Sequence, residues 1–129
     1  MKIAIEAQRI FRPNKHGMDF VALETIRELQ KRNDDNQYFV IVAPGEDRCL
    51  EESSNLSIIE LKSLSYPLWE QIALPRAVKH LGVDLLHCTS NTAPLYCSVP
   101  LVLTLHDIIY LEPRQHRSPS LYQEMGWHY

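Results

Sequence analysis

A histidine and an aspartate, His106 and Asp107, directly follow a run of apolar residues over 101–105. Such a run is typical of a strand that is buried on both faces of a parallel sheet. Ligands of open α/β sheets bind in the crevice outside the carboxyl ends of the strands. His106 could hydrogen-bond a substrate hydroxyl there or act as an acid or base, and Asp107 could orient it or cap the next turn. A purely structural histidine is the competing interpretation.

A basic loop is predicted to reach the same edge of the sheet. Residues 8–16 include Arg12, Lys15 and His16 and contain no acid, and Gly17 follows where a helix should begin. The bare N–H groups and the positive end of that helix could bind a phosphate. The alternative is a solvated loop with a glycine at the helix N-cap.

A third segment follows the fourth predicted strand and contains Ser90 and Asn91. Small hydroxyl and amide groups at this edge could hydrogen-bond a polyol. They could equally cap the backbone of a polar turn. Both interpretations stay open on the sequence.

Composition and the absence of several motifs narrow the function classes. The 129 residues suffice for one domain with a real core, and a net charge of −3 argues against nucleic-acid binding. Three cysteines in no framework spacing indicate a reducing, cytoplasmic location. The sequence contains no metal-ligand spacing, no dinucleotide-binding glycine motif, no nucleophile elbow of a serine hydrolase and no P-loop. We therefore expect no metal and no cofactor.

Strands that alternate with helices must position these segments. Strands are predicted at 2–7, 38–43, 56–61, 83–87 and 101–105, with a polar loop or short helix at 46–55. A helix over 67–81 should kink or divide at Pro75 and end at Gly82. The pattern predicts a doubly wound, mainly parallel α/β sheet of the Rossmann-like type.

Each predicted helix should bury one apolar face. For the first helix the spacing selects Met18, Val21, Ala22, Thr25, Ile26 and Leu29. For the second helix it selects Trp69, Ile72, Ala73, Val78 and Leu81. A further helix begins near Ser118 without a stop signal, so we expect the chain to be a piece of a longer protein.

Several segments together resemble family 4 glycosyltransferases. They are MKIAIEAQ at 1–8, HGM at 16–18, LWEQ at 68–71, LP at 74–75, DLLH at 84–87 and PLVLTLHDI at 100–108. The resemblance extends over nearly the whole chain in the right order, and the last segment is the most specific.

The resemblance implies the N-terminal half of a GT-B architecture, in which two Rossmann-like domains face each other across a cleft. This half mainly shapes the acceptor site, and a C-terminal half, absent from this chain, binds most of the nucleotide-sugar donor. The resemblance places Gly17 near the donor phosphates and His106 against the transferred sugar. The chain departs from the family pattern where His16 and Met18, rather than a second small residue, flank Gly17, and where Phe20 replaces a common tyrosine.

The leading hypothesis is therefore the N-terminal domain of a retaining, hexosyltransferase-type enzyme of surface polysaccharide or glycolipid assembly, inert as an isolated chain. Its partners would be a nucleotide-sugar and a glycan or lipid-linked acceptor, with no nucleic acid. A location at the inner face of the cell membrane fits such enzymes, although no strongly basic amphipathic helix supports it. The alternatives are a freestanding α/β module that binds an anion or a sugar without catalysis, and another sugar-phosphate enzyme of GT-B shape.

Overall fold

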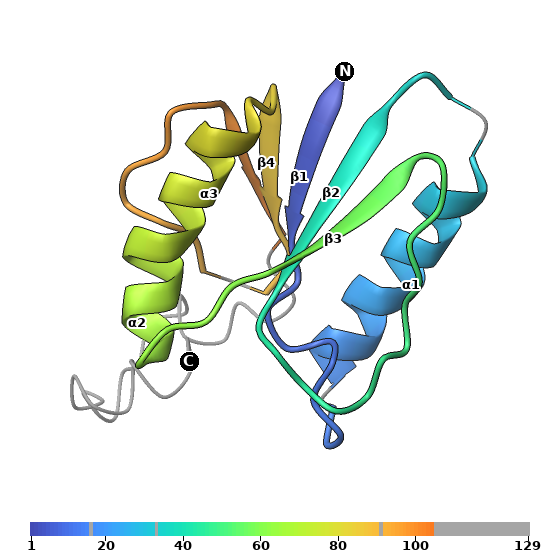
Figure 1. The fold of residues 1–129 in the computed structure, drawn as a ribbon, viewed down its shortest axis with the longest axis horizontal. Helices are drawn as coiled ribbons and strands as arrows, with labels where there is room; N and C mark the ends of the chain where they lie inside the picture. Colours follow the sequence, from blue (N-terminus) through green and yellow to red (C-terminus); the bar gives the residue numbers. More distant parts are fainter. Residues whose placement is uncertain (16, 33, 91, 105–129) are drawn as a thin grey trace, which may run out of the picture.

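Five parallel strands form the centre of the molecule (Figure 1). The computed structural model describes residues 1–15, 17–32, 34–90 and 92–104. All four neighbouring strand pairs are parallel, in the order β3-β2-β1-β4-β5. The strands are β1 (Lys2–Glu6), β2 (Gln37–Val42), β3 (Leu56–Glu60), β4 (Leu85–Cys88) and β5 (Leu101–Leu103). The predicted Rossmann-like α/β class is confirmed, and each predicted strand exists with shifted ends.

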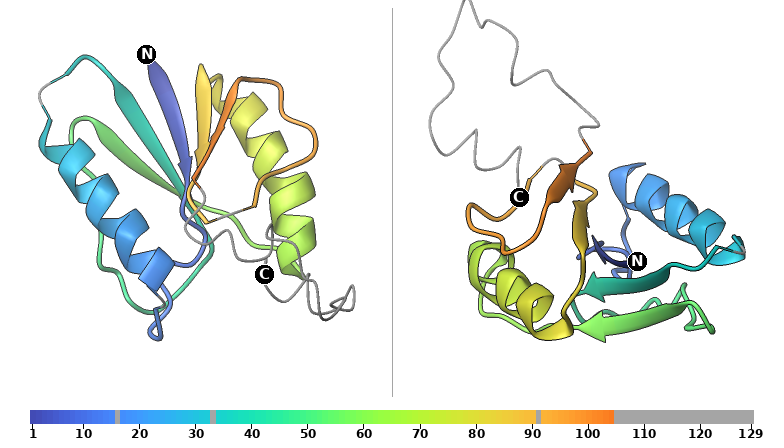
Figure 2. Two further views of the ribbon diagram at one scale, coloured as in Figure 1. Left: turned by 180° about the vertical axis from the view of Figure 1, so that it is seen from behind. Right: turned by 90° about the horizontal axis from the view of Figure 1, so that it is seen from above.

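Helices cover both faces of this sheet (Figure 2). The helix α1 (Gly17–Lys31) connects β1 to β2 on one face. On the other face a continuous helical segment consists of α2 (Tyr66–Leu68), the π-helical turn η1 (Trp69–Ala73) and α3 (Leu74–Leu81), and it carries the chain from β3 back to β4. The strand order therefore reverses between β1 and β4, and this reversal is the position at which open α/β sheets bind ligands.

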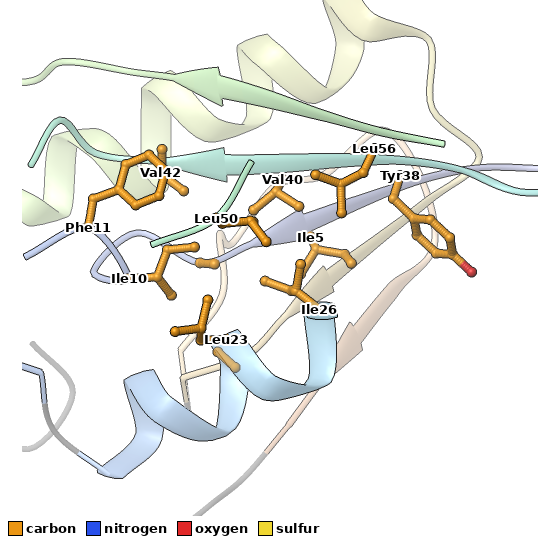
Figure 3. Packing of buried hydrophobic residues seen from close by; sticks show 12 residues of the cluster. Ile5, Ile10, Phe11, Leu23, Ile26, Tyr38, Val40, Val42, Leu50 and Leu56 are labelled. Atoms are coloured by element: carbon orange, nitrogen blue, oxygen red, sulfur yellow. The ribbon is translucent and has the colours of Figure 1, made fainter. Parts of the chain in front are cut away.

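The α1 face of the sheet is closed by an apolar cluster (Figure 3). Leu23 and Ile26 of α1 pack toward Ile5 of β1 and Val40 of β2, and Ile10 and Phe11 of the first loop complete the cluster. The predicted buried face of α1 is partly wrong. Ala22 and Ile26 are buried, but Val21 and Thr25 are exposed, and Asp19 and Leu23 are buried instead.

Ion pairing explains why the buried stripe of α1 differs from the apolar pattern. A guanidinium nitrogen of Arg12 lies 3.4 Å from a carboxylate oxygen of Asp19, which is 2% exposed. This contact lets a charged residue occupy a buried position, which a count of apolar residues cannot anticipate. The Thr25 hydroxyl meanwhile donates to the Val21 carbonyl at 2.8 Å on the exposed side.

The opposite face is closed by η1 and α3. Trp69, Leu74 and Val78 are buried against the sheet, and the Trp69 indole donates to the Leu61 carbonyl at 2.9 Å. Ile72 was predicted to be buried but is half exposed, and Glu70 is buried instead. The wider π turn shifts the phase of the helix, which moves Ile72 away from the sheet.

Instead of the kink or division predicted at Pro75, the helical segment changes from π-helical to α-helical geometry at Leu74 and stays continuous. A proline ring within an α-helix collides with the carbonyl four residues earlier. Here the Leu74 N–H donates to the carbonyl of Trp69, five residues back, so the segment continues past Pro75 without a break. The predicted stop is confirmed, because Gly82 has a φ of 65°, in the left-handed region.

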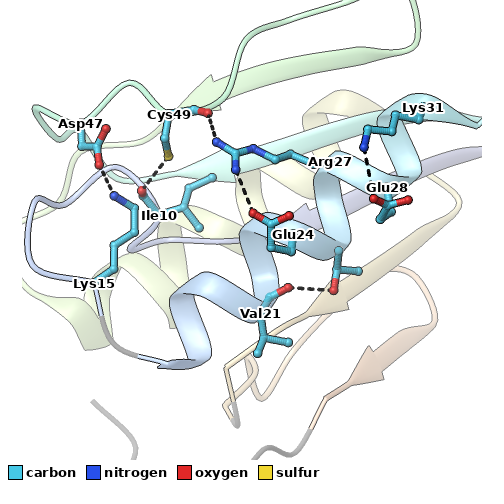
Figure 4. A network of polar contacts seen from close by, with 10 residues as sticks. Ile10, Lys15, Val21, Glu24, Arg27, Glu28, Lys31, Asp47 and Cys49 are labelled. Carbon is cyan, nitrogen blue, oxygen red and sulfur yellow. Dashed lines mark hydrogen bonds and ion pairs between the residues drawn. The ribbon is translucent and has the colours of Figure 1, made fainter.

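Residues 46–55 form an irregular loop, which is one of the two forms predicted for this segment. Its start depends on Gly45, where an added Cβ would lie 2.4 Å from the carbonyl oxygen of Phe11. The loop is tied to α1 by Arg27, which donates to Glu24 and to the Cys49 carbonyl at 2.8 and 2.9 Å (Figure 4). The helix expected from residue 118 lies outside the described residues.

Candidate functional site

Hydroxyl groups gather where β1 and β4 end, at the reversal of strand order. Thr89, Ser90 and Thr92 directly follow β4 and are all buried. The Thr89 hydroxyl donates to the carbonyl of Glu6, the last residue of β1, at 2.7 Å. Ser90 thus lies at the edge where the sequence places it, whereas Asn91 lies outside the described residues.

Two cations of the first loop are paired with acids. Arg12 contacts Asp19, as described above. The Lys15 ammonium forms an ion pair with Asp47 (Figure 4). It also donates to the Arg12 carbonyl at 3.1 Å. Residues 8–16 contain no acid themselves. In the structure, however, Asp47 from the loop after β2 lies against Lys15. We conclude that Arg12 and Lys15 help to hold the loop in place.

Gly17 opens α1 as the sequence predicts. It is exposed, and a Cβ added there would meet no atom of the described part of the chain within 4 Å. The start of α1 is therefore accessible to a ligand, which fits an anion at the helix N-terminus. The neighbouring His16 lies outside the described residues, as do His106 and Asp107.

Sequence reasoning missed a buried carboxylate at this edge. The Glu6 side chain is 1% exposed, and its Oε2 accepts a hydrogen bond from the Gln8 N–H at 2.8 Å. Among the described residues, its Oε1 has no hydrogen-bond partner. The pKa of Glu6 is raised to about 7, mainly by burial; the Gln8 N–H opposes this rise, and the nearby Glu70 carboxylate adds to it. The signal in the sequence was Glu6 itself, a charged residue near the end of an apolar strand.

Glu70 approaches the same place from the helical segment. It is 1% exposed, accepts a hydrogen bond from the Thr92 hydroxyl, and its Oε1 accepts one from the Gln71 amide at 3.1 Å. Tyr66, one turn earlier, hydrogen-bonds Thr92, and burial raises the pKa of its phenol. We call Glu6, Tyr66, Glu70 and Thr92 the carboxyl cluster.

His87 lies away from the edge. It stands within β4 on the α1 face, where its Nε2 lies 2.6 Å from the Thr104 hydroxyl, and burial lowers its pKa. Together with Ile3, Leu85 and Val102 it lines an apolar cavity of about 340 Å³.

The described residues contain neither a metal site nor a membrane-spanning helix. Within residues 1–15, 17–32, 34–90 and 92–104, no three His, Cys, Asp or Glu side chains are grouped so that they could hold a metal ion. In the same part of the chain, no helix has the length and apolar character needed to cross a membrane.

A doubly wound parallel sheet with polar groups at its reversal point defines the Rossmann-like class of ligand-binding α/β domains. The family model for Glycosyltransferase Family 4 matches residues 16–129. The chain therefore belongs to this family, as an N-terminal domain, and its function is of the glycosyltransferase type. Searches of curated proteins and of solved structures gave no match.

Proposed function

We propose that this chain is the acceptor-side half of a retaining, hexosyltransferase-type enzyme. The enzyme would move a sugar from a nucleotide-sugar to a glycan or glycolipid acceptor, as surface polysaccharide assembly requires. Family membership is the observation that carries this proposal. The exposed start of α1 and the hydroxyls after β4 support it, because they lie at the carboxyl edge of the sheet.

The chemistry of sugar transfer gives each group a role. Retaining transfer passes through an oxocarbenium-like state while negative charge develops on the departing diphosphate. The N–H groups at Gly17 would stabilise that diphosphate, with His16 beside them. Ser90, Asn91 and Asp107 would hydrogen-bond sugar hydroxyls, and His106 would contact the transferred sugar.

Arg12 and Lys15 have a more indirect role in this proposal. Their pairing with Asp19 and Asp47 fixes the loop that precedes Gly17. They would thereby position the start of α1 and contribute less direct charge to the phosphate than the sequence suggests. The isolated chain would be inert, since the donor would bind mainly to a second domain.

A titration with inorganic pyrophosphate, followed by NMR, tests the phosphate site. We expect the amide signals of Gly17 and Met18 to shift in the wild-type chain and in Gly17→Ala, because an added methyl group meets nothing. In Gly17→Asp the new carboxylate would repel the anion, and the shifts should disappear. Shifts that persist in Gly17→Asp, or that never involve α1, would count against the phosphate site.

A further inference from the structure

We propose that one exposed face of the chain binds the surface of an anionic lipid membrane. This face, which we call the outer face, belongs to residues 61–82 and 93–100 and points away from the sheet. Its exposed members are Lys62, Leu64, Leu68, Ile72, Arg76, Lys79, His80, Leu95 and Tyr96. Binding to lipid stands on these residues alone, and only its use in sugar transfer rests on the proposed function.

A row of exposed side chains runs along the helical segment at a spacing of four residues. Side chains at this spacing lie on the same side of a helix. The apolar part of the row consists of Leu64, Leu68 and Ile72, which are 98%, 41% and 49% exposed. Arg76 and His80 continue the row and are exposed as well. The segment is therefore apolar toward the sheet and also on the first half of its outer side.

Two protruding side chains lie beside this row. Leu95 and Tyr96 are each 85% exposed. The Leu95 N–H donates to Oε1 of Gln71 at 2.7 Å, which holds this residue against the middle of the helical segment. Tyr96 lines a shallow groove together with Arg76 and Lys79, where the chain runs beside α3 (Figure 1). Exposed apolar side chains that gather in this way mark an interaction surface.

The charges of the outer face have one sign, because its charged side chains are those of Lys62, Arg76 and Lys79. Glu70, the one acid within 61–82 and 93–100, is 1% exposed. The acids that flank the helical segment have partners of their own. Glu60 pairs with Arg48, and Asp84 accepts a hydrogen bond from the Lys2 N–H at 2.8 Å. The outer face therefore favours an anionic partner.

An anionic lipid surface is the partner that matches both properties. On a helix that lies in the membrane interface, apolar side chains enter the acyl boundary while lysine and arginine meet the anionic head groups. The tyrosine beside these cations suits the same boundary, because its ring is apolar and its hydroxyl group is polar. A second copy of the chain, packed symmetrically, would instead bring the same cations against each other and would supply no acid.

Binding at the outer face would bring the candidate site close to the membrane. Tyr66 of the carboxyl cluster lies in the same helical turn as Leu68. This turn, α2, lies at the end of the sheet where β1 and β4 end (Figure 1). If the proposed function holds, a lipid-linked acceptor would reach this edge without leaving the membrane.

Co-sedimentation of the purified chain with lipid vesicles tests this inference. We expect binding to vesicles of phosphatidylcholine and phosphatidylglycerol in equal parts, much weaker binding to phosphatidylcholine alone, and a decrease as salt is raised. Leu95→Asp should weaken binding by roughly tenfold or more, because a buried leucine side chain is lost. Lys79→Gln should weaken it about fivefold through the loss of one cation at the anionic surface. No binding to the mixed vesicles, or equal binding to both kinds, would overturn the proposal.

Each variant has a matched control on α1. Val21→Asp introduces the same carboxylate at an exposed apolar position. Lys31→Gln removes a lysine from the last turn of α1, as Lys79→Gln does from the last turn of α3. Both controls should leave vesicle binding nearly unchanged. Losses as large as those in the outer-face variants would contradict binding through this face.

A second measurement needs no variant and applies if Leu95→Asp does not fold. In bicelles of the same two lipids, a spin-labelled lipid should broaden the amide signals of Leu68, Ile72 and Leu95 before that of Val21. Broadening centred on α1, or dimerisation through the outer face without lipid binding, would overturn the proposal. Neither experiment contains a sugar or pyrophosphate, so their failure is distinguishable from failure of the proposed function.

Discussion

Glu6 is buried in the fold and lies at the carboxyl edge of the sheet, where the candidate site is. The residue pairs with Ile41 and Cys88 in the two neighbouring strands, so its backbone is fixed at the centre of the sheet. Its side chain is directed to the face that η1 covers, next to Glu70. A core position occupied by a carboxyl group stabilises less than an apolar one would, and such exceptions are typical of functional sites.

Glu6 should make the stability of the chain depend on pH. The pKa of Glu6 rises from 4.5 to about 7 on folding, so the folded state retains a proton that the unfolded state loses. The free energy of unfolding should therefore decrease between pH 4.5 and about 7, by up to about 3 kcal/mol. In Glu6→Gln this decrease should be absent, and urea unfolding across that range measures it. A decrease of equal size in the variant would assign the effect to other groups.

Replacement by alanine should affect the stability of the chain differently at Gly17 and at Gly45. Gly17→Ala should change the free energy of unfolding by less than about 1 kcal/mol, because the added Cβ meets nothing. Gly45→Ala should destabilise the chain by about 1–3 kcal/mol, since its Cβ would collide with the Phe11 carbonyl. Thermal unfolding of the two variants side by side checks this, and equal effects would contradict the close packing at Gly45.

At the scale of elements, the sequence predicts which segments are strands and helices, but it predicts only part of the buried face of each helix. Alternation of apolar strands with amphipathic helices correctly indicates a doubly wound sheet. The buried face of α1 includes Asp19, which pairs with Arg12 of the preceding loop, and an apolar pattern does not reveal that contact. Likewise, a π turn before Pro75 moves Ile72 outward and Glu70 inward.

The candidate site was predictable only in part, for a related reason. The end of β4 brings Ser90 to the edge because strand direction is fixed by topology. The pairing of Lys15 with Asp47 could not be foreseen, since the two residues meet only after β2 has been placed. His106 and Asp107 stay predictions, because they lie outside the described residues.

Leu74 tests the contribution of the helical segment to the core. It is fully buried against the sheet, directly after the π turn. Leu74→Ala should lower the free energy of unfolding by about 2–5 kcal/mol through lost contacts and a cavity. The matched control is Leu64→Ala at a 98% exposed position, which should change it by less than about 0.5 kcal/mol. Similar losses in both variants would contradict the packing of η1 and α3 described above.

At the scale of the whole molecule, the reversal of strand order brings three separate segments to one edge. The start of α1, the loop after β4 and the carboxyl cluster all lie there, although they are far apart in sequence. The apolar cavity beside His87 lies on the α1 face, within the strands, and is not part of this edge. A glycosyltransferase domain that binds its substrates should therefore respond to them at that edge.

The most direct test combines binding and turnover on the purified chain. A panel of nucleotide-sugars is added with simple glycan acceptors, while amide shifts and release of the nucleoside diphosphate are recorded. Our account predicts small shifts at Gly17 and at residues 89–92, with no nucleotide released. Sugar transfer by this chain alone, or shifts centred on Ile3, Leu85 and His87, would contradict it.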